Sequence, residues 1–248
     1  MKLTVLGCCG AFPSHGVGTT SYLVESDHFH LLIDLGSSTF VELEKYLNPF
    51  EVDAMIVSHY HYDHIADIGV FQYYRQLKKD PIHEEQPILP IYGHTQNPLH
   101  FKELTLAGVS RGCAYNDEES ITVGPFNISF MRTLHPVPTY AMRIVEKSTG
   151  KVLVFTADSG YMEAFNDFAR DADLFLADTY FLNGNENNKA HLTAQETGKI
   201  GKVAKVRHIV ATHLAEGVDL NMLKFQIEEA SHHQIPVDIA TRDAVYTI

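Results

Sequence analysis

Three histidines and an aspartate occupy six consecutive positions in the stretch "HYHYDH", residues 59–64. His59 and His61 are two residues apart, so on an extended segment their side chains point to the same side. Asp63 and His64 are adjacent and fit a chain that is turning into a helix. Neutral imidazole and carboxylate are ligands of zinc and of related metals. A solvated loop with incidental histidines is the alternative, but four such groups converging without a metal would carry desolvation and repulsion costs. The pattern therefore predicts a metal site.

The segments on either side of this cluster show how it is positioned. The apolar run "DAMIVS" before it, residues 53–58, is typical of a buried strand. Residues 63–80 after it have apolar side chains at helical spacing and end in lysines, as the C-terminus of a helix prefers. The cluster therefore lies at the end of a strand, in a loop that opens a helix. Open α/β sheets usually bind their ligands at this place.

Three further residues could complete a metal site. Each is the first polar residue of a ligand type after an apolar strand: His135 in "FMRTLHP", Asp158 in "VLVFTADSG" and His213 in "RHIVATHL". Taken singly, each is explained as an ordinary polar group at a strand end. Together with the first cluster they give seven ligands, which are enough for two metal ions.

Strands and then helices alternate twice along the chain. Strands are expected over residues 3–7, 19–26, 28–36, 53–58, 88–93, 120–123, 126–135, 140–146, 151–158, 173–180, 207–213 and 236–248. Helices are expected over residues 37–47, 63–80, 97–106, 161–170, 192–206 and 219–233, the fifth with the capping box of Thr193 and Glu196. The order predicts an α/β protein in which two sheets pack face to face with helices outside.

Composition narrows the classes of function. The 248 residues carry a formal net charge of −12, which weighs against gripping long nucleic acid. A small phosphate substrate is compatible with this charge, because bound metal ions would reverse the local field.

The three cysteines imply no disulfide framework and fit a reducing, cytoplasmic compartment. No run reaches transmembrane length, so no membrane partner is expected. No linker interrupts the chain, and we expect one domain over residues 1–248.

The chain resembles the metallo-β-lactamase superfamily. "HYHYDH" is similar to the His-x-His-x-Asp-His signature of that family, and His135, Asp158 and His213 are similar to its third, fourth and fifth motifs. The early stretches "TTSYLVES" and "LLIDLGSS" match its opening strands and its Asp-x-Gly turn. The resemblance implies a four-layer αβ/βα sandwich, the metallo-β-lactamase fold, with a dinuclear site along one edge.

The same resemblance implies an assignment of the ligands. His59, His61 and His135 would bind the first metal; Asp63, His64 and His213 would bind the second; Asp158 and a hydroxide would bridge the two. Asp34 would orient a ligand histidine. Ligation rich in imidazole favours two zinc ions, and the carboxylates leave room for manganese or iron.

A further run, "HLTAQE" beginning at His191, resembles a motif of the tRNase Z branch and its phosphodiesterase relatives. In that branch the histidine protonates the leaving oxygen; the alternative is a residue before a helix with no role. Long-armed tRNase Z enzymes carry a basic insertion between the third-motif histidine and the bridging aspartate. Here residues 136–157 leave room only for a hairpin. The phosphodiesterase of phosphonate degradation has an N-terminal cysteine zinc cluster that "CCGAFPSHG" cannot rebuild.

These observations predict a dinuclear metal-dependent hydrolase, a phosphodiesterase for small or cyclic phosphodiesters. Asp63 would accept the proton of the nucleophile and His191 would protonate the leaving alkoxide. The alternatives are an acyl hydrolase that opens lactones or thioesters, a tRNA 3′ processing endoribonuclease and a non-catalytic metal-binding protein. Loops at residues 13–18, 94–118 and 136–141 would shape the substrate face, and the chain is expected to form a homodimer.

Overall fold

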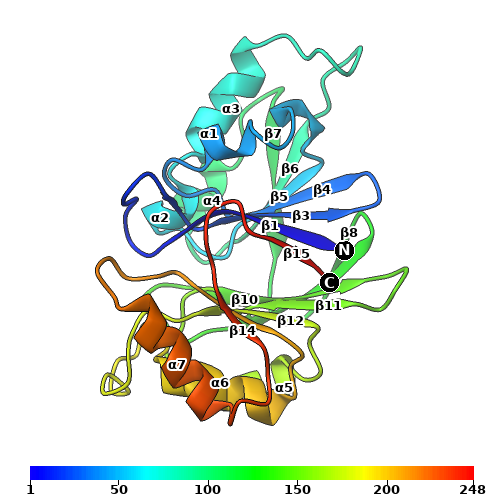
Figure 1. The fold of residues 1–248 in the computed structure, drawn as a ribbon. Helices are drawn as coiled ribbons and strands as arrows, with labels where there is room; N and C mark the ends of the chain where they lie inside the picture. Colours follow the sequence, from blue (N-terminus) through cyan, green and yellow to red (C-terminus); the bar gives the residue numbers. More distant parts are fainter. The chain divides into compact units, whose positions relative to one another are not determined.

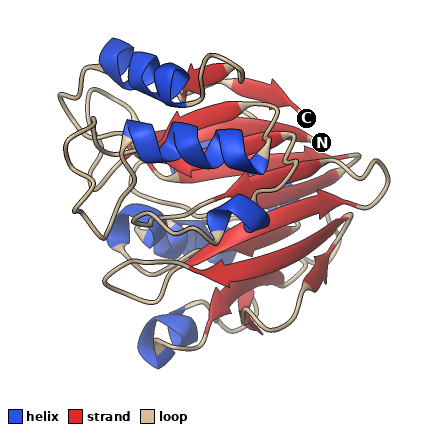
Figure 2. Cartoon of the chain, turned by 90° about the horizontal axis from the view of Figure 1, so that it is seen from below, coloured by secondary structure: helices blue, strands red, loops and turns tan.

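The structure, a computed structural model, describes all residues from 1 to 248. It divides into two compact units: unit 1 comprises Met1–Asn116 with Arg242–Thr247, and unit 2 comprises Asp117–Thr241 with Ile248. Each unit combines a sheet with helices (Figures 1 and 2). The organisation as one domain stays a prediction. No helix is long and apolar enough to cross a membrane.

The sheet of unit 1 has the strand order β15-β1-β3-β4-β5-β6-β7, with β2 paired to β1. From β15 to β4 the strands along this path are antiparallel, and from β4 to β7 they are parallel. The strands are β1 (Lys2–Cys9), β2 (Gly18–Thr19), β3 (Ser21–Ser26), β4 (Phe29–Ile33), β5 (Ala54–Ile56), β6 (Leu89–His94), β7 (Ser110–Tyr115) and β15 (Val245–Thr247).

Short helices cover this sheet and close its core. They are α1 (Phe40–Leu43), η1 (Pro49–Glu51), α2 (Tyr62–Ile65), α3 (Ile68–Leu77) and α4 (Pro98–Glu103). Phe40 of α1 and Phe71 of α3 belong to the same buried cluster as Leu32 and Met55 of the sheet. Apolar burial of this kind holds the helices on the strands, because each side chain removed from water contributes about 1.5–3 kcal/mol.

The sheet of unit 2 has the order β14-β13-β12-β11-β10-β9-β8, antiparallel from β8 to β11 and parallel from β11 to β14. Its helices α6 and α7 pack against each other, α6 on β12 and β13 and α7 on β14 (Figure 1). The elements are β8 (Ile121–Val123), β9 (Phe126–Arg132), β10 (Tyr140–Glu146), β11 (Val152–Phe155), α5 (Phe165–Phe168), β12 (Leu174–Asp178), α6 (Ala194–Ala204), β13 (Ile209–Thr212), α7 (Leu220–Ala230) and β14 (Val237–Ile239).

Several elements differ from the sequence-based expectation, and two of the differences have a clear physical reason. The single helix expected over residues 63–80 is two helices, α2 and α3, because the N–H of Asp67 donates to the carbonyl of Leu35 and its carboxylate accepts from the N–H of Phe40. Strand β7 lies between the helix expected over residues 97–106 and the strand expected over residues 120–123, where no strand was expected. Its sequence, "SRGCAY", has neither a continuous apolar run nor a clear alternation, so its pairing with β6 decides its conformation.

Candidate metal centre

Polar residues gather at the carboxyl ends of the parallel strands in each unit. In unit 1, Asp34 follows β4 and His59 follows the strand β5. In unit 2, Asp158 follows β11, Asp178 ends β12 and His213 follows β13. Since parallel neighbours end at the same edge of a sheet, each unit collects its own set of ligand-type side chains.

The backbone at three of these strand ends is in the left-handed region. The φ angle is 54° at Asp34, 51° at Ala157, directly before Asp158, and 54° at His213. Residues other than glycine adopt this conformation at a cost of order 1–3 kcal/mol, and such positions cluster at functional sites. The surrounding structure therefore holds these side chains in directions that a relaxed strand would not give them.

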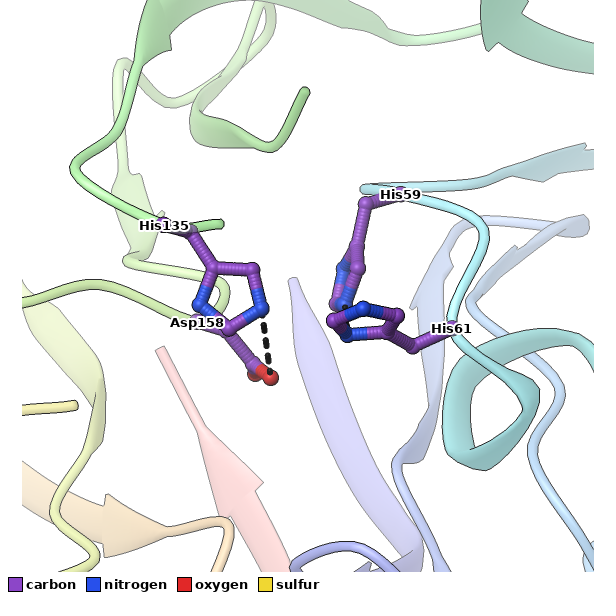
Figure 3. Close-up of side chains that lie close together, drawn as sticks. All are labelled: His59, His61, His135 and Asp158. Atoms are coloured by element: carbon purple, nitrogen blue, oxygen red, sulfur yellow. Dashed lines mark hydrogen bonds and ion pairs between the residues drawn. The ribbon is translucent and has the colours of Figure 1, made fainter. Parts of the chain in front are cut away.

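In unit 1 the two histidines of the first half-motif lie together. Nε2 of His59 is 3.1 Å from Nδ1 of His61 (Figure 3). Two nitrogens bound to one zinc ion at about 2.1 Å are separated by roughly 3.0–3.4 Å for angles from square to tetrahedral. The spacing of the two rings fits a shared ion.

Asp34 holds the ring of His64, in the second half of the motif, by a hydrogen bond. Its carboxylate is fully buried and accepts hydrogen bonds from the backbone N–H of Ser58 at 2.7 Å and the Ser58 hydroxyl at 2.7 Å. It also accepts one from Nδ1 of His64 at 2.8 Å. Because Nδ1 of His64 is the donor, Nε2 is left as the ligand atom, and it lies 3.7 Å from Oδ2 of Asp63.

The short helix α2, which carries Asp63 and His64, is bound to the backbone just before β3 and just after β4. The N–H of Thr20 donates to the carbonyl of Asp63 at 3.1 Å, and the N–H of Leu35 donates to that of His64 at 2.8 Å. A Cβ atom at Gly36 would lie 2.0 Å from the Asp63 carbonyl oxygen, so only glycine allows this approach. The direction of the ligand side chains follows from these backbone contacts.

In unit 2 one carboxylate faces two histidines. Oδ2 of Asp158 is 3.8 Å from Nε2 of His135, drawn as a dashed line in Figure 3, and 3.4 Å from Nε2 of His213. On its other side the His135 ring donates from Nδ1 to the carbonyl of Ala190 at 3.0 Å. The imidazole nitrogens that face Asp158 are therefore the ones that could bind a metal.

Asp178 is a functional residue that the sequence reasoning missed. Its Oδ2 accepts from the N–H of Ser159 at 3.1 Å and from Nδ1 of His191 at 2.9 Å, and its Oδ1 lies 3.5 Å from Nδ1 of His213. One buried carboxylate thus holds His191 by a hydrogen bond and also faces His213. The signal was present, since Asp178 is the first polar residue after the apolar run "LFLA", as Asp158 follows "VLVFTA".

His191 lies against aromatic rings. Its ring stacks on Tyr180, with centroids 4.8 Å apart, and on His213, with centroids 5.1 Å apart. Burial alone would lower the pKa of His191, but the charge and hydrogen bond of Asp178, with the charge of Asp158, outweigh it and raise the pKa above its ordinary value. In the absence of a metal, the imidazole is held in a field that favours its protonated form.

The donor set fits divalent transition metals. One ligand atom each of Asp158, Asp178, His191 and His213 lies within 4.8 Å of the others, and all are nitrogen or carboxylate oxygen. Cys8 is a poor candidate for a thiolate ligand, because burial raises the pKa of its thiol to about 12. Unit 1 thus contains the candidate ligands His59, His61, Asp63 and His64, and unit 2 contains the candidate ligands His135, Asp158 and His213, with His191 beside them.

Comparison with known proteins gives a consistent picture. The family described as "Metallo-beta-lactamase superfamily" matches residues 16–204. The chain is 40% identical over 226 residues to the probable metallo-hydrolase YhfI of Bacillus subtilis (strain 168), covering 90% of this chain and 91% of that protein. The crystal structure of YhfI superposes with a TM-score of 0.93 at 36% identity, over 99% of this chain and 98% of that chain.

Two more distant structures share the fold. The short form of human tRNase Z has a TM-score of 0.74 at 18% identity, over 100% of this chain and 99% of that chain. A diphosphatase from the PhnP family has a TM-score of 0.75 at 18% identity, over 100% and 97%. At this level of identity the likeness is one of fold alone.

Proposed function

Because the chain belongs to the metallo-β-lactamase superfamily and is a metallo-hydrolase, we propose that it hydrolyses small or cyclic phosphodiesters. The family and the fold class expected from the sequence are thereby confirmed. The observation that carries the finer proposal is the hydrogen bond of 2.9 Å between Asp178 and Nδ1 of His191, next to the ligand His213. It gives the chain a positioned proton donor that metal ligation does not require.

In this proposal the candidate ligands of both units bind the same two divalent metal ions, for which zinc is the preferred metal. His59, His61 and His135 would bind one ion, Asp63, His64 and His213 the other, and Asp158 both. When bound, such ions lower the pKa of a water toward neutrality and polarise a phosphoryl oxygen. The proposal rests on family membership and on the ring orientations that Asp34, Asp178 and the Ala190 carbonyl set within each unit.

His191 would act as the general acid. Asp178 engages its Nδ1, so the proton transferred to the leaving oxygen would come from Nε2. Asp63 would accept the proton of the attacking water; the N–H of Ala11 donates to its Oδ2 at 3.0 Å and steadies the carboxylate. An alkoxide leaves poorly without a proton, and a positioned acid contributes roughly 10²–10⁴ in rate.

Small substrates are favoured over tRNA. Strands β10 and β11 pair directly from Met142–Phe155 to Val145–Val152, and the N–H of Glu146 donates to the carbonyl of Lys151 at 2.9 Å. The interval between His135 and Asp158 is therefore a hairpin without a tRNA-binding arm. A formal charge of −12 gives the same indication. The tRNase Z and diphosphatase structures, which share the fold, carry names that denote reactions at phosphorus, so the fold is compatible with the proposal.

Changing His191 to alanine tests the proposal. The variant should keep its metal and lose roughly 10²–10⁴ in kcat on an alkyl phosphodiester, but lose less on bis(p-nitrophenyl) phosphate, whose nitrophenolate departs without help. Exposed His28→Ala is the matched control and should change neither rate. Asp158→Ala should abolish both activities and lower the metal content measured by emission spectrometry.

The same assay separates phosphodiester from acyl chemistry. A lactone and thioester panel is run on the same metal-loaded preparation. The phosphodiesterase proposal fails if the wild type opens lactones rapidly while His191→Ala cleaves every diester as fast as the wild type does. An acyl hydrolase that uses the same metal ligands would then take its place.

A further inference from the structure

A shallow pocket of about 320 Å³ lies in unit 2 beside the ligand His135. Its lining is Leu134, His135, Pro136, Asn188, Lys189 and Ala190. The set contains one candidate metal ligand and one cation, and it contains no carboxylate. The volume is at the lower end of those that bind small molecules, which is enough for one substituent of a substrate.

The segment that forms one wall of this pocket is held in place. Oδ1 of Asn188 accepts from the N–H of Ala190 at 2.7 Å and from that of His191 at 3.1 Å. The Ala190 carbonyl accepts from His135 at 3.0 Å. A Cβ atom at Gly160 would lie 2.8 Å from the carbonyl carbon of Lys189, so the Lys189 backbone lies directly on Gly160. The base of the Lys189 side chain is thereby fixed two residues away from the imidazole of His191.

The position of the pocket relates it to one part of the substrate. The rings of His135 and His191 are 5.5 Å apart between centroids, so the pocket adjoins the general acid. His191 would protonate the oxygen that leaves. The portion of the substrate attached to that oxygen therefore lies nearest to residues 188–190.

Charge identifies what the pocket would bind. Lys189 is exposed and forms no ion pair, in a chain with a formal net charge of −12. The acid nearest to it in sequence, Glu186, accepts a hydrogen bond from the N–H of Gly184 at 2.9 Å within its own turn. An available ammonium beside the acid would attract an anion that the rest of the surface repels.

We propose that this pocket, the Lys189 pocket, binds a second phosphate on the leaving portion of the substrate. The preferred substrates are then phosphodiesters whose leaving alcohol is itself phosphorylated. This specificity rests on the proposed phosphodiesterase function and names the substrate class within it.

The kinetic test compares uridylyl-uridine with its forms phosphorylated at either end. The wild-type protein should cleave one phosphorylated form about tenfold better, as expected for a charge-assisted contact. Lys189→Ala should remove that preference by raising the KM for the phosphorylated form. Its rates on unphosphorylated uridylyl-uridine and on bis(p-nitrophenyl) phosphate should stay within about twofold of those of the wild type. Lys189→Arg should retain it. Exposed Lys147→Ala, on the β10–β11 turn, is the matched control for loss of one positive charge. Equal cleavage of all three dinucleotides by the wild type, or a uniform loss in Lys189→Ala, overturns the proposal.

A binding measurement keeps the two proposals apart. Calorimetric titration should show tighter binding of adenosine 3′,5′-bisphosphate than of adenosine 5′-monophosphate, and Lys189→Ala should remove the difference. If the difference is found while no diester is cleaved, the phosphodiesterase function fails and the pocket stands. If the two nucleotides bind equally to the wild type, the pocket is overturned whatever the enzyme hydrolyses.

Discussion

At the scale of single residues, two buried carboxylates lie next to the Nδ1 atoms of candidate histidine ligands. Asp34 accepts from Nδ1 of His64, and Asp178 lies 3.5 Å from Nδ1 of His213. The hydrogen bond leaves Nε2 of His64 for a ligand bond, and Nε2 of His213 faces Asp158 at 3.4 Å. Asp178 in addition accepts from His191, so a metal ligand and the proposed acid depend on the same side chain.

Asp34→Asn should weaken metal binding about 10–100-fold. The amide of asparagine has one oxygen, so it cannot accept from the backbone N–H of Ser58 and from Nδ1 of His64 at once. The His64 ring would then carry its proton on Nε2, the ligand atom. Competition against a chelator of known affinity measures the loss. Asp27→Asn is the matched control, because Asp27 has a similar φ of 53° but is exposed. Unchanged metal affinity in Asp34→Asn would show that His64 needs no orienting partner.

The sequence indicated the seven candidate ligands because each follows an apolar strand or belongs to a dense motif, and their role as ligands stays a prediction. Asp178 obeys the same rule as Asp158, yet it was not selected. The reason is that a carboxylate acting through histidines is recognisable only when its distance to their Nδ1 atoms is known. Tyr180, which stacks on His191, carried no signal at all, since an aromatic residue after a strand is ordinary.

At the scale of elements, the parallel strands were predictable and their continuations were not. The buried runs of β4, β5, β11, β12 and β13 are apolar and short, so their existence and their polar ends could be read directly. The break between α2 and α3 and the strand β7 depend on contacts with residues distant in sequence. Local pattern contains no information about those contacts.

Gly36→Ala should destabilise the protein by more than about 2 kcal/mol and reduce metal binding. A Cβ at this position would lie 2.0 Å from the Asp63 carbonyl oxygen and 2.2 Å from Oγ1 of Thr19. Helix α2, which carries Asp63, must therefore move. Urea unfolding with and without zinc measures both effects. Gly69→Ala in α3 is the control, because a Cβ there meets nothing within 4 Å and should be neutral or stabilising. Equal stability of the two variants would contradict the close approach.

Asp173→Asn should cost about 1 kcal/mol at neutral pH and less in acid. Asp173, directly before β12, accepts from Lys151 at 2.9 Å and from the N–H of Val152 at 2.9 Å. Burial alone would raise its pKa, but these hydrogen bonds and the charges of Lys151 and Arg207 lower the pKa below its ordinary value.

The sign of the pH effect follows from that direction. A carboxyl group whose pKa is lower in the folded state stabilises the protein above its unfolded pKa of about 3.9 and loses this contribution as the pH falls through the folded pKa. The difference between wild type and Asp173→Asn, measured by urea unfolding, should therefore shrink below about pH 4. Asp167→Asn, whose side chain is 81% exposed, should show no such difference.

At the scale of the whole molecule, alternating strands and helices predicted the class, and the family signature predicted the fold. Sequence could not supply the strand orders β15-β1-β3 and β14-β13-β12, because an edge neighbour is chosen by long-range pairing. The low cysteine count and the net charge constrained partners and left the architecture open.

The homodimer stays a prediction, and we expect its contact on one face of α3. Val70, Tyr73 and Leu77 lie at helical spacing on α3 and are 51%, 63% and 75% exposed. An uncharged stripe is where two copies with a net charge of −12 could approach each other. Light scattering at micromolar concentration should give the mass of a dimer, and Leu77→Lys should shift it toward the monomer. A monomeric wild type would remove this expectation.

The edge of β1 has a consequence for synthesis on the ribosome. Strand β15 pairs with β1, and the contact of Arg242 with the Gly16 carbonyl joins residues 226 apart in sequence. While the nascent chain grows, β1 is made early and its outer backbone groups stay without this cover until residues 242–247 have left the exit tunnel. An exposed strand edge invites pairing with other chains. Ribosomes that stall between β14 and β15 would therefore yield an aggregation-prone product, although all seven candidate ligands of the metal centre would already have been made.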